Sequence, residues 1–100
     1  METFTIEKFA EALNERFILR AGPGEELDLK LVAVQDLTPT PANTVGFRRK
    51  PFSARFRGPR TPWARQHTYS MENERLGEMQ IFVVPLGLSG EEMVYEAIFS

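Results

Sequence analysis

Seven basic side chains and no acidic side chain lie between residues 37 and 71. The flanks have the opposite character, since residues 1–36 carry a net charge of −4 and residues 72–100 a net charge of −5. Arginine, the main basic residue here, binds carboxylates and phosphates through paired hydrogen bonds, so this segment is where recognition chemistry is expected. The candidate partner-binding residues are Arg48, Arg49, Lys50, Arg55, Arg57, Arg60, Trp63 and Arg65.

Three interpretations of this basic segment are open. It can pair with the acidic flanks across neighbouring strands, at roughly a few tenths of a kcal/mol per pair. It can bind an acidic patch on a protein partner, or join copies of the chain head to tail. It can also bind single-stranded nucleic acid, because Phe47, Phe52, Phe56 and Trp63 are interleaved with the arginines. The acidic remainder of the chain would repel phosphates and weighs against this third interpretation.

Trp63 follows a proline in a segment rich in turn residues. A loop tryptophan either covers one end of a barrel as a lid or is an exposed anchor for a partner. Soluble monomers rarely expose large aromatic side chains, which favours the lid.

Catalytic constellations are missing from the sequence. The chain has no cysteine, and His67 is its only histidine. No Gly-x-Ser-x-Gly nucleophile motif occurs. The acidic pairs Glu25-Glu26 and Glu91-Glu92 adjoin turns, and neighbouring strand residues point to opposite faces, so we interpret both pairs as solvated turn charges. The sequence predicts a non-enzymatic protein with no metal and no cofactor. A small enzyme that uses carboxylates brought together from distant strands is the other interpretation.

The elements that must position the basic residues are mostly strands. Apolar residues at helical spacing (Ile6, Phe9, Ala10 and Leu13) predict one amphipathic helix with Thr5 as its N-cap. Period-two alternation predicts the strands. Leu27, Leu29, Leu31 and Ala33 should share one buried face. The predicted strands are 16–20, 27–34, 52–57, 67–72, 79–86 and 93–99. Between them we expect a loop over 37–45, which is long if it runs to Lys50, turns at 21–24, 58–63 and 73–77, and a hairpin connection at 87–90.

The sequence therefore predicts that residues 1–100 form one domain of the mainly β class. Short connections and the lack of βαβ alternation favour a small antiparallel β-barrel or strongly curled sheet of about six strands, with one short N-terminal helix. Such a barrel is filled by its own side chains, so a large internal cavity is not expected. No signal peptide, lipidation motif or membrane-spanning segment is apparent, and we expect a cytoplasmic protein.

Two motifs carry a resemblance to a known family. They are Pro51-Phe52-Ser53-x-x-Phe56-Arg57-Gly58 and Tyr95-Glu96-Ala97-Ile98-Phe99. With the motifs before and between them, these resemble a family of small uncharacterised bacterial proteins of the domain-of-unknown-function type. Genes of that family often lie near those for phage-tail-collar proteins of the microcystin-dependent-protein kind. The resemblance implies a role in a phage-tail-like or fibre-like assembly, with a phage-like particle as a second location. It brings no catalytic residues.

Overall fold

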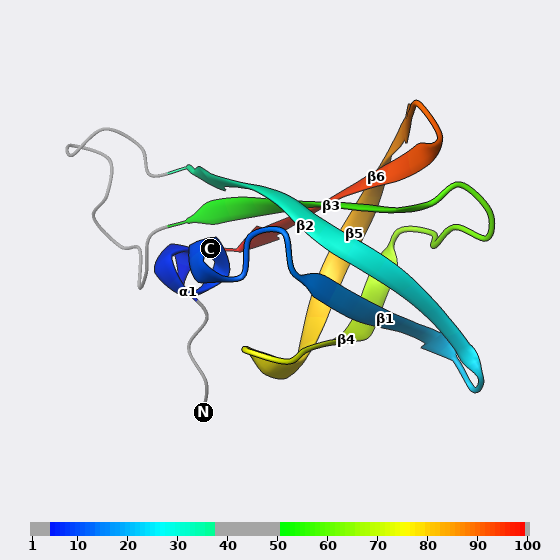
Figure 1. The fold of residues 1–100 in the computed structure, drawn as a ribbon, viewed down its shortest axis with the longest axis horizontal. Helices are drawn as coiled ribbons and strands as arrows, with labels where there is room; N and C mark the ends of the chain where they lie inside the picture. Colours follow the sequence, from blue (N-terminus) through cyan, green and yellow to red (C-terminus); the bar gives the residue numbers. More distant parts are fainter. Residues whose placement is uncertain (1–4, 38–50, 100) are drawn as a thin grey trace.

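The computed structural model describes residues 5–37 and 51–99, in which one helix and six strands are found (Figure 1). All neighbouring strands are antiparallel, and they close into a barrel in the order β1-β2-β3-β6-β5-β4. The predicted mainly β barrel with one short N-terminal helix is confirmed. Arg48, Arg49 and Lys50 lie outside the described residues. The elements are α1 (Ile6–Glu11), β1 (Arg16–Gly22), β2 (Glu25–Asp36), β3 (Phe52–Pro59), β4 (His67–Asn73), β5 (Gly77–Ser89) and β6 (Glu92–Phe99).

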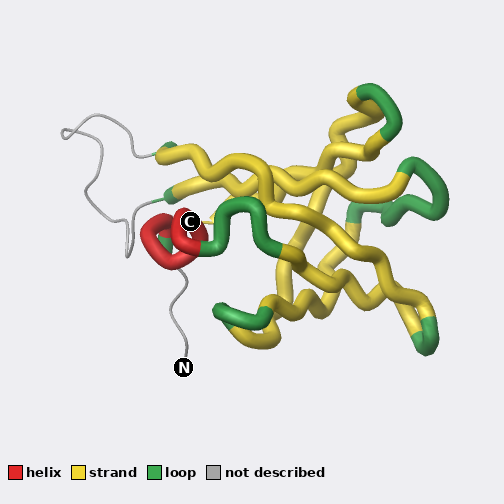
Figure 2. Tube along the Cα trace, in the orientation of Figure 1, coloured by secondary structure: helices red, strands yellow, loops and turns green. Residues whose placement is uncertain are grey.

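Helix α1 lies at one end of the barrel, beside the C-terminal end of β6 (Figure 2). Thr5 is its N-cap, because the hydroxyl accepts a hydrogen bond from the Lys8 backbone N at 3.2 Å. Phe9 is completely buried, and its ring centroid lies 5.4 Å from that of Phe52 and 4.9 Å from that of Phe99. The helix therefore closes this end of the core with one aromatic side chain.

The predicted apolar face of the helix is only partly correct. The helix ends at Glu11, with Ala12 as its C-cap, so Leu13 lies beyond it and is 42% exposed. Ala10 is also exposed, and Ala12 is buried in its place. A six-residue helix has too few turns to present the four-residue stripe that the spacing predicted.

The barrel interior is filled by alternate residues of all six strands. Phe52, Ala54 and Phe56 of β3 point inward as predicted, and so do Tyr95 and Ala97 of β6. Because these side chains are almost inaccessible to solvent, burial of apolar surface is the main stabilising contribution.

Strand β2 contains a bulge that reverses its alternation. The pairing with β3 shifts register between Leu31 and Ala33. Leu31 is buried as predicted, but Ala33 is exposed and Val34 packs against the core instead. The prediction that Ala33 lies on the buried face is therefore wrong, because an extra residue in one strand turns the following side chains to the other face.

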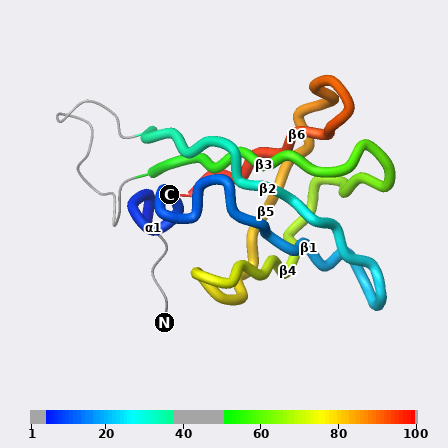
Figure 3. Tube along the Cα trace, viewed as in Figure 1, coloured from blue at the N-terminus to red at the C-terminus, as the bar shows by residue number. Residues whose placement is uncertain are grey.

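Strand β5 contains a second bulge, between Pro85 and Gly87. The strand continues past it to Ser89, so only Gly90 and Glu91 separate β5 from β6. The predicted hairpin connection at 87–90 is thus too early. Figure 3 shows the resulting β5–β6 hairpin extending away from α1.

Gly58 of β3 lies where a larger residue would collide with the core. A Cβ atom at this position would be 2.3 Å from Leu29 Cδ2 and 3.5 Å from Tyr95 Cε1. Leu29 is only 2% exposed, so it has little room to move. We expect Gly58→Ala to lower the free energy of unfolding by about 1–3 kcal/mol, as overpacking does.

Urea denaturation of Gly58→Ala, Leu29→Ala and the double variant checks this. Leu29→Ala removes the colliding methyl group, so the double variant should lose less stability than the sum of the single variants. Additive losses would show that the two side chains do not compete for this space.

Candidate protein-interaction surface

Three of the predicted partner-binding arginines lie next to carboxylates of the same chain. Strand register places Arg55 directly opposite Glu96, and Arg55 Nε lies 3.3 Å from Glu96 Oε2. Arg57 Nη1 lies 3.5 Å from Glu92 Oε1. The first interpretation of the basic segment, internal cross-strand pairing, therefore holds for this part of β3.

A third pair extends the pattern past the end of β3. Arg60 Nη1 lies 3.6 Å from Glu91 Oε1, and these side chains are 58% and 91% exposed. At such exposure an ion pair contributes little, about 0–1 kcal/mol. The arginines of residues 55–60 are therefore partly neutralised. Glu91 is a solvated turn charge as predicted, while Glu92 is the first residue of β6 and pairs with Arg57.

These pairs leave much of the arginine hydrogen-bonding capacity unused. A guanidinium group carries five N–H donors. Among the described residues, Arg55 donates one side-chain hydrogen bond, through Nε, and Arg57 donates none. Both guanidinium groups can therefore donate hydrogen bonds to a further carboxylate without first breaking a strong internal bond.

The aromatic residues that suggested nucleic-acid binding are mostly unavailable. Phe52 and Phe56 are completely buried in the barrel, where they cannot stack on bases. Phe47 lies outside the described residues. Of this set, Trp63 is the one aromatic side chain that the described ranges show at the surface.

Trp63 lies in the loop between β3 and β4 (residues 60–66, called here the Trp63 loop), and its side chain is 49% exposed. Two hydrogen bonds fix the residues that follow it. Ala64 N donates to Tyr95 Oη at 2.8 Å in the buried interior, and Tyr69 Oη donates to Arg65 O at 2.8 Å. Trp63 is exposed and does not belong to the buried core, so the favoured lid role is not supported, while the loop backbone is held in place.

Arg65 is the remaining candidate in this loop. It is exposed, and within residues 5–37 and 51–99 its side chain forms no ion pair. The Trp63 loop therefore presents one half-exposed aromatic side chain with a basic side chain two residues later.

Tyr95 is the residue that ties the Trp63 loop to the core. Burial raises the pKa of its phenol, although the hydrogen bond donated by Ala64 N acts in the opposite direction. We expect Tyr95→Phe to cost about 1–3 kcal/mol, because the buried Ala64 N–H loses its acceptor. Thermal denaturation measures this loss, and an unchanged melting temperature would contradict the role given to the bond.

The raised pKa also predicts how stability depends on alkaline pH. The phenol stays protonated in the folded protein while the unfolded chain ionises near pH 10, so stability is complete below about pH 10 and falls as pH rises toward the folded pKa. This contribution of Tyr95 should be absent from Tyr95→Phe. Urea denaturation of both proteins across this range measures the difference.

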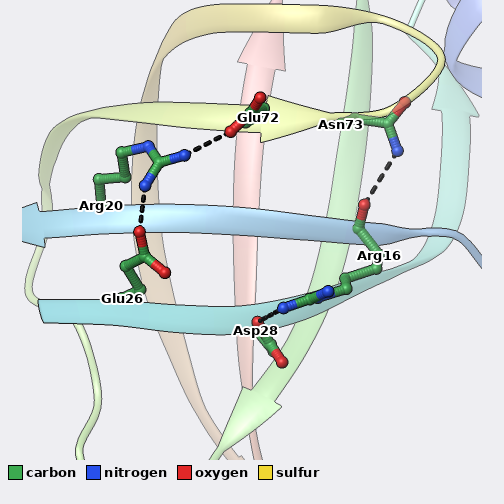
Figure 4. A network of polar contacts seen from close by, with 6 residues as sticks. All are labelled: Arg16, Arg20, Glu26, Asp28, Glu72 and Asn73. Carbon is green, nitrogen blue, oxygen red and sulfur yellow. Dashed lines mark hydrogen bonds and ion pairs between the residues drawn. The ribbon is translucent and has the colours of Figure 1, made fainter.

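The opposite outer wall, over β1, β2 and β4, carries a closed polar network (Figure 4). Arg20 lies between Glu26 and Glu72 and pairs with both. Arg16 Nη2 lies 2.9 Å from Asp28 Oδ1. Glu26, interpreted from the sequence as a solvated turn charge, is thus an ion-pair partner. Alternation placed these residues outward, but only strand order shows which of them meet.

Asn73 and Glu15 extend this network to the start of β1. Asn73 Nδ2 donates to Arg16 O at 2.9 Å and to Glu15 Oε1 at 3.3 Å. A hydrogen bond from Arg75 holds the pKa of Glu15 below its usual value. The charged side chains of this network pair with one another, so we do not count this wall as a recognition surface.

Neither a membrane-crossing helix nor a metal-binding cluster is found in the described part of the chain. Its one helix is too short to span a bilayer. Residues 5–37 and 51–99 also contain no group of three or more histidine or acidic side chains placed to hold a metal ion.

The fold and surface define a small, filled antiparallel β-barrel with a fixed loop that exposes a tryptophan. The chain belongs to the family described as a domain of unknown function (DUF6916), whose model matches residues 4–99. The predicted membership in a family of the domain-of-unknown-function type is confirmed to that extent, while bacterial origin and phage-tail neighbours stay predictions. No curated protein and no solved structure matches the chain significantly.

Proposed function

We propose that this domain is a non-enzymatic protein-interaction module that binds a protein partner through the Trp63 loop and the neighbouring arginines of β3. The observation that carries the proposal is a tryptophan side chain 49% exposed on a backbone fixed by hydrogen bonds of Ala64 and Arg65. A residue of this kind is a typical interface anchor, because it buries a large area and loses little conformational freedom on binding.

The arginines give this surface its preference for an acidic partner. Arg65 is unpaired among the described residues, and the pairs of Arg57 and Arg60 with glutamates span 3.5 and 3.6 Å at exposed positions. Weak pairs of this kind exchange readily for a partner carboxylate. Phe52 and Phe56 are buried and cannot stack on bases, so the single-stranded nucleic-acid alternative has less support.

The partner belongs, in this proposal, to a phage-tail-like or fibre-like assembly, in the cytoplasm or in a phage-like particle. Support comes from the resemblance of the Pro51–Gly58 and Tyr95–Phe99 motifs to a family whose genes often lie near phage-tail-collar genes. A solid barrel without a catalytic constellation in its described residues fits such a structural role.

Affinity-tagged protein expressed in the native host tests the proposal. Trp63→Ala should lose a specific co-purifying protein that the unaltered chain retains. Phe82→Ala is the matched control, because Phe82 is 50% exposed but lies on β5. Equal recovery from both variants, or recovery of a free monomer in every case, would contradict the proposal.

Binding of single-stranded oligonucleotides at low salt decides the alternative. Salt-dependent binding that Arg55→Glu/Arg57→Glu abolishes would favour nucleic acid. We expect no binding, because Phe52 and Phe56 are buried and the chain carries a net charge of −2.

A further inference from the structure

A groove lies on the outer wall of the barrel between the bulged parts of β2 and β5. Its volume is about 490 Å³, within the roughly 300–1,000 Å³ typical of ligand sites. Strands β3 and β6 lie between β2 and β5 in the barrel order. The side chains that define its chemistry are Val32, Arg55, Arg57, Leu86, Leu88 and Val94.

The apolar part of the groove is unusually open to solvent. Leu86 is 48% exposed and Leu88 is 51% exposed, on the segment of β5 that contains and follows its bulge. Val94 of β6 pairs with Gly87 at that bulge and is half-buried. Leaving several aliphatic side chains together in water is unfavourable, so such a patch marks a contact surface.

The charged part of the groove is a pair of arginines at strand spacing. Arg55 and Arg57 lie on the same face of β3, two residues and therefore roughly 6–7 Å apart. Acidic side chains two residues apart on an extended peptide have the same spacing. The N–H donors of Arg55 and Arg57 that the internal pairs leave unused can form hydrogen bonds with these acidic side chains.

We propose that this groove binds an extended segment of a partner protein whose acidic and aliphatic side chains lie on one face, at every second position of the segment. The carboxylates meet Arg55 and Arg57, and the aliphatic side chains cover Leu86 and Val94. Charge complementarity selects this occupant, because the groove combines cationic donors with an apolar wall. A phosphate backbone would bring no aliphatic surface to cover Leu86 and Val94.

This inference rests on the proposed role in protein binding, but it concerns a surface distinct from Trp63. Trp63 does not line the groove. The test therefore uses defined peptides, whose binding does not require the native partner.

Fluorescence anisotropy with labelled leucine–glutamate, leucine–lysine and serine–glutamate peptides tests the groove. In each peptide the two named residue types share every second position and serine fills the positions between, so that both types face the groove. The leucine–glutamate peptide should bind most tightly. The double variant Arg55→Ala/Arg57→Ala and the single variant Leu86→Ser should each weaken it by about tenfold or more. Arg16→Ala is the matched control, since Arg16 pairs with Asp28 on the other wall, and it should leave binding unchanged. Circular dichroism confirms that each variant is folded.

Equal binding of the leucine–glutamate and leucine–lysine peptides would overturn the inference. It would also be overturned if Arg16→Ala weakened binding of the leucine–glutamate peptide as much as the groove variants do. Concentration-dependent dimerisation that Leu86→Ser abolishes would assign the groove to a second copy of the chain and would also overturn it. Trp63→Ala should not change peptide affinity. If peptides fail to bind while Trp63-dependent capture persists, only the groove assignment is wrong.

Discussion

Replacing Phe9 with alanine is expected to lower the free energy of unfolding by about 3–5 kcal/mol. The Phe9 side chain has no solvent exposure, and its ring lies within contact of Phe17, Phe52 and Phe99 at centroid separations of 6.1, 5.4 and 4.9 Å. Its removal leaves a cavity between α1 and the barrel, because a short helix held by one buried aromatic residue cannot close over the space. Such a loss is a large part of the roughly 5–15 kcal/mol by which a domain of this size is stable.

Urea denaturation measures this effect, with Phe82→Ala as the control. Phe82 has the same side chain but is 50% exposed on the outer wall, so its loss should change stability by only about 0.5 kcal/mol. Similar losses for the two variants would mean that α1 does not close the core as described.

Replacing Asn73 with alanine is expected to cost about 2–3 kcal/mol. The Asn73 side chain forms four hydrogen bonds and the residue is only 3% exposed. Its Oδ1 accepts from Arg75 N and Leu76 N, each at 2.9 Å, which shapes the β4–β5 turn. Its Nδ2, on β4, donates to the backbone O of Arg16 on the neighbouring strand β1. Alanine leaves these part-buried groups without partners.

Thermal denaturation compares Asn73→Ala with Ser70→Ala. Ser70 Oγ bonds Glu78 at 3.1 Å on the same wall, but that bond is exposed to water. We expect Ser70→Ala to be nearly neutral, because solvent replaces the lost bond. If both variants lose the same stability, the burial of the Asn73 bonds is not what makes them important.

Alternation of apolar residues was enough to predict where the strands lie. Phe52, Ala54 and Phe56 repeat with period two over a stretch with no extra residue, and the structure buries all three. The same rule failed at Ala33, because a bulge adds a residue to β2 and a bulge has no reliable signature in a single sequence. The end of α1 was missed for a related reason, since helix boundaries depend on caps and on tertiary packing.

The candidate residues were predictable, but their partners were not. Alternation with Phe52, Ala54 and Phe56 predicts that Arg55 and Arg57 lie on the outer face of β3, where the structure has them. The sequence does not predict that register sets Arg55 opposite Glu96 and Arg57 opposite Val94. Strand order and register arise from contacts between distant segments, which composition and periodicity do not encode.

The groove between β2 and β5 could not be predicted from the sequence, for the same reason. Leu86 and Leu88 appeared to be the end of a strand and part of a hairpin turn. Alternation places Leu86 outward, but only strand order and register bring it, together with Leu88 beyond the bulge, to the same wall as Arg55 and Arg57.

The most direct test of the central claim, that the Trp63 loop is a protein-binding site, is photo-crosslinking in the native host. A photoreactive residue replaces Thr61, which is exposed in the same loop, while Trp63 stays intact. The account predicts one discrete adduct with a protein partner, lost when Trp63→Ala is added and absent when the photoreactive residue is at Gln80, exposed on β5. No adduct at position 61, or the same adducts at both positions, would contradict it.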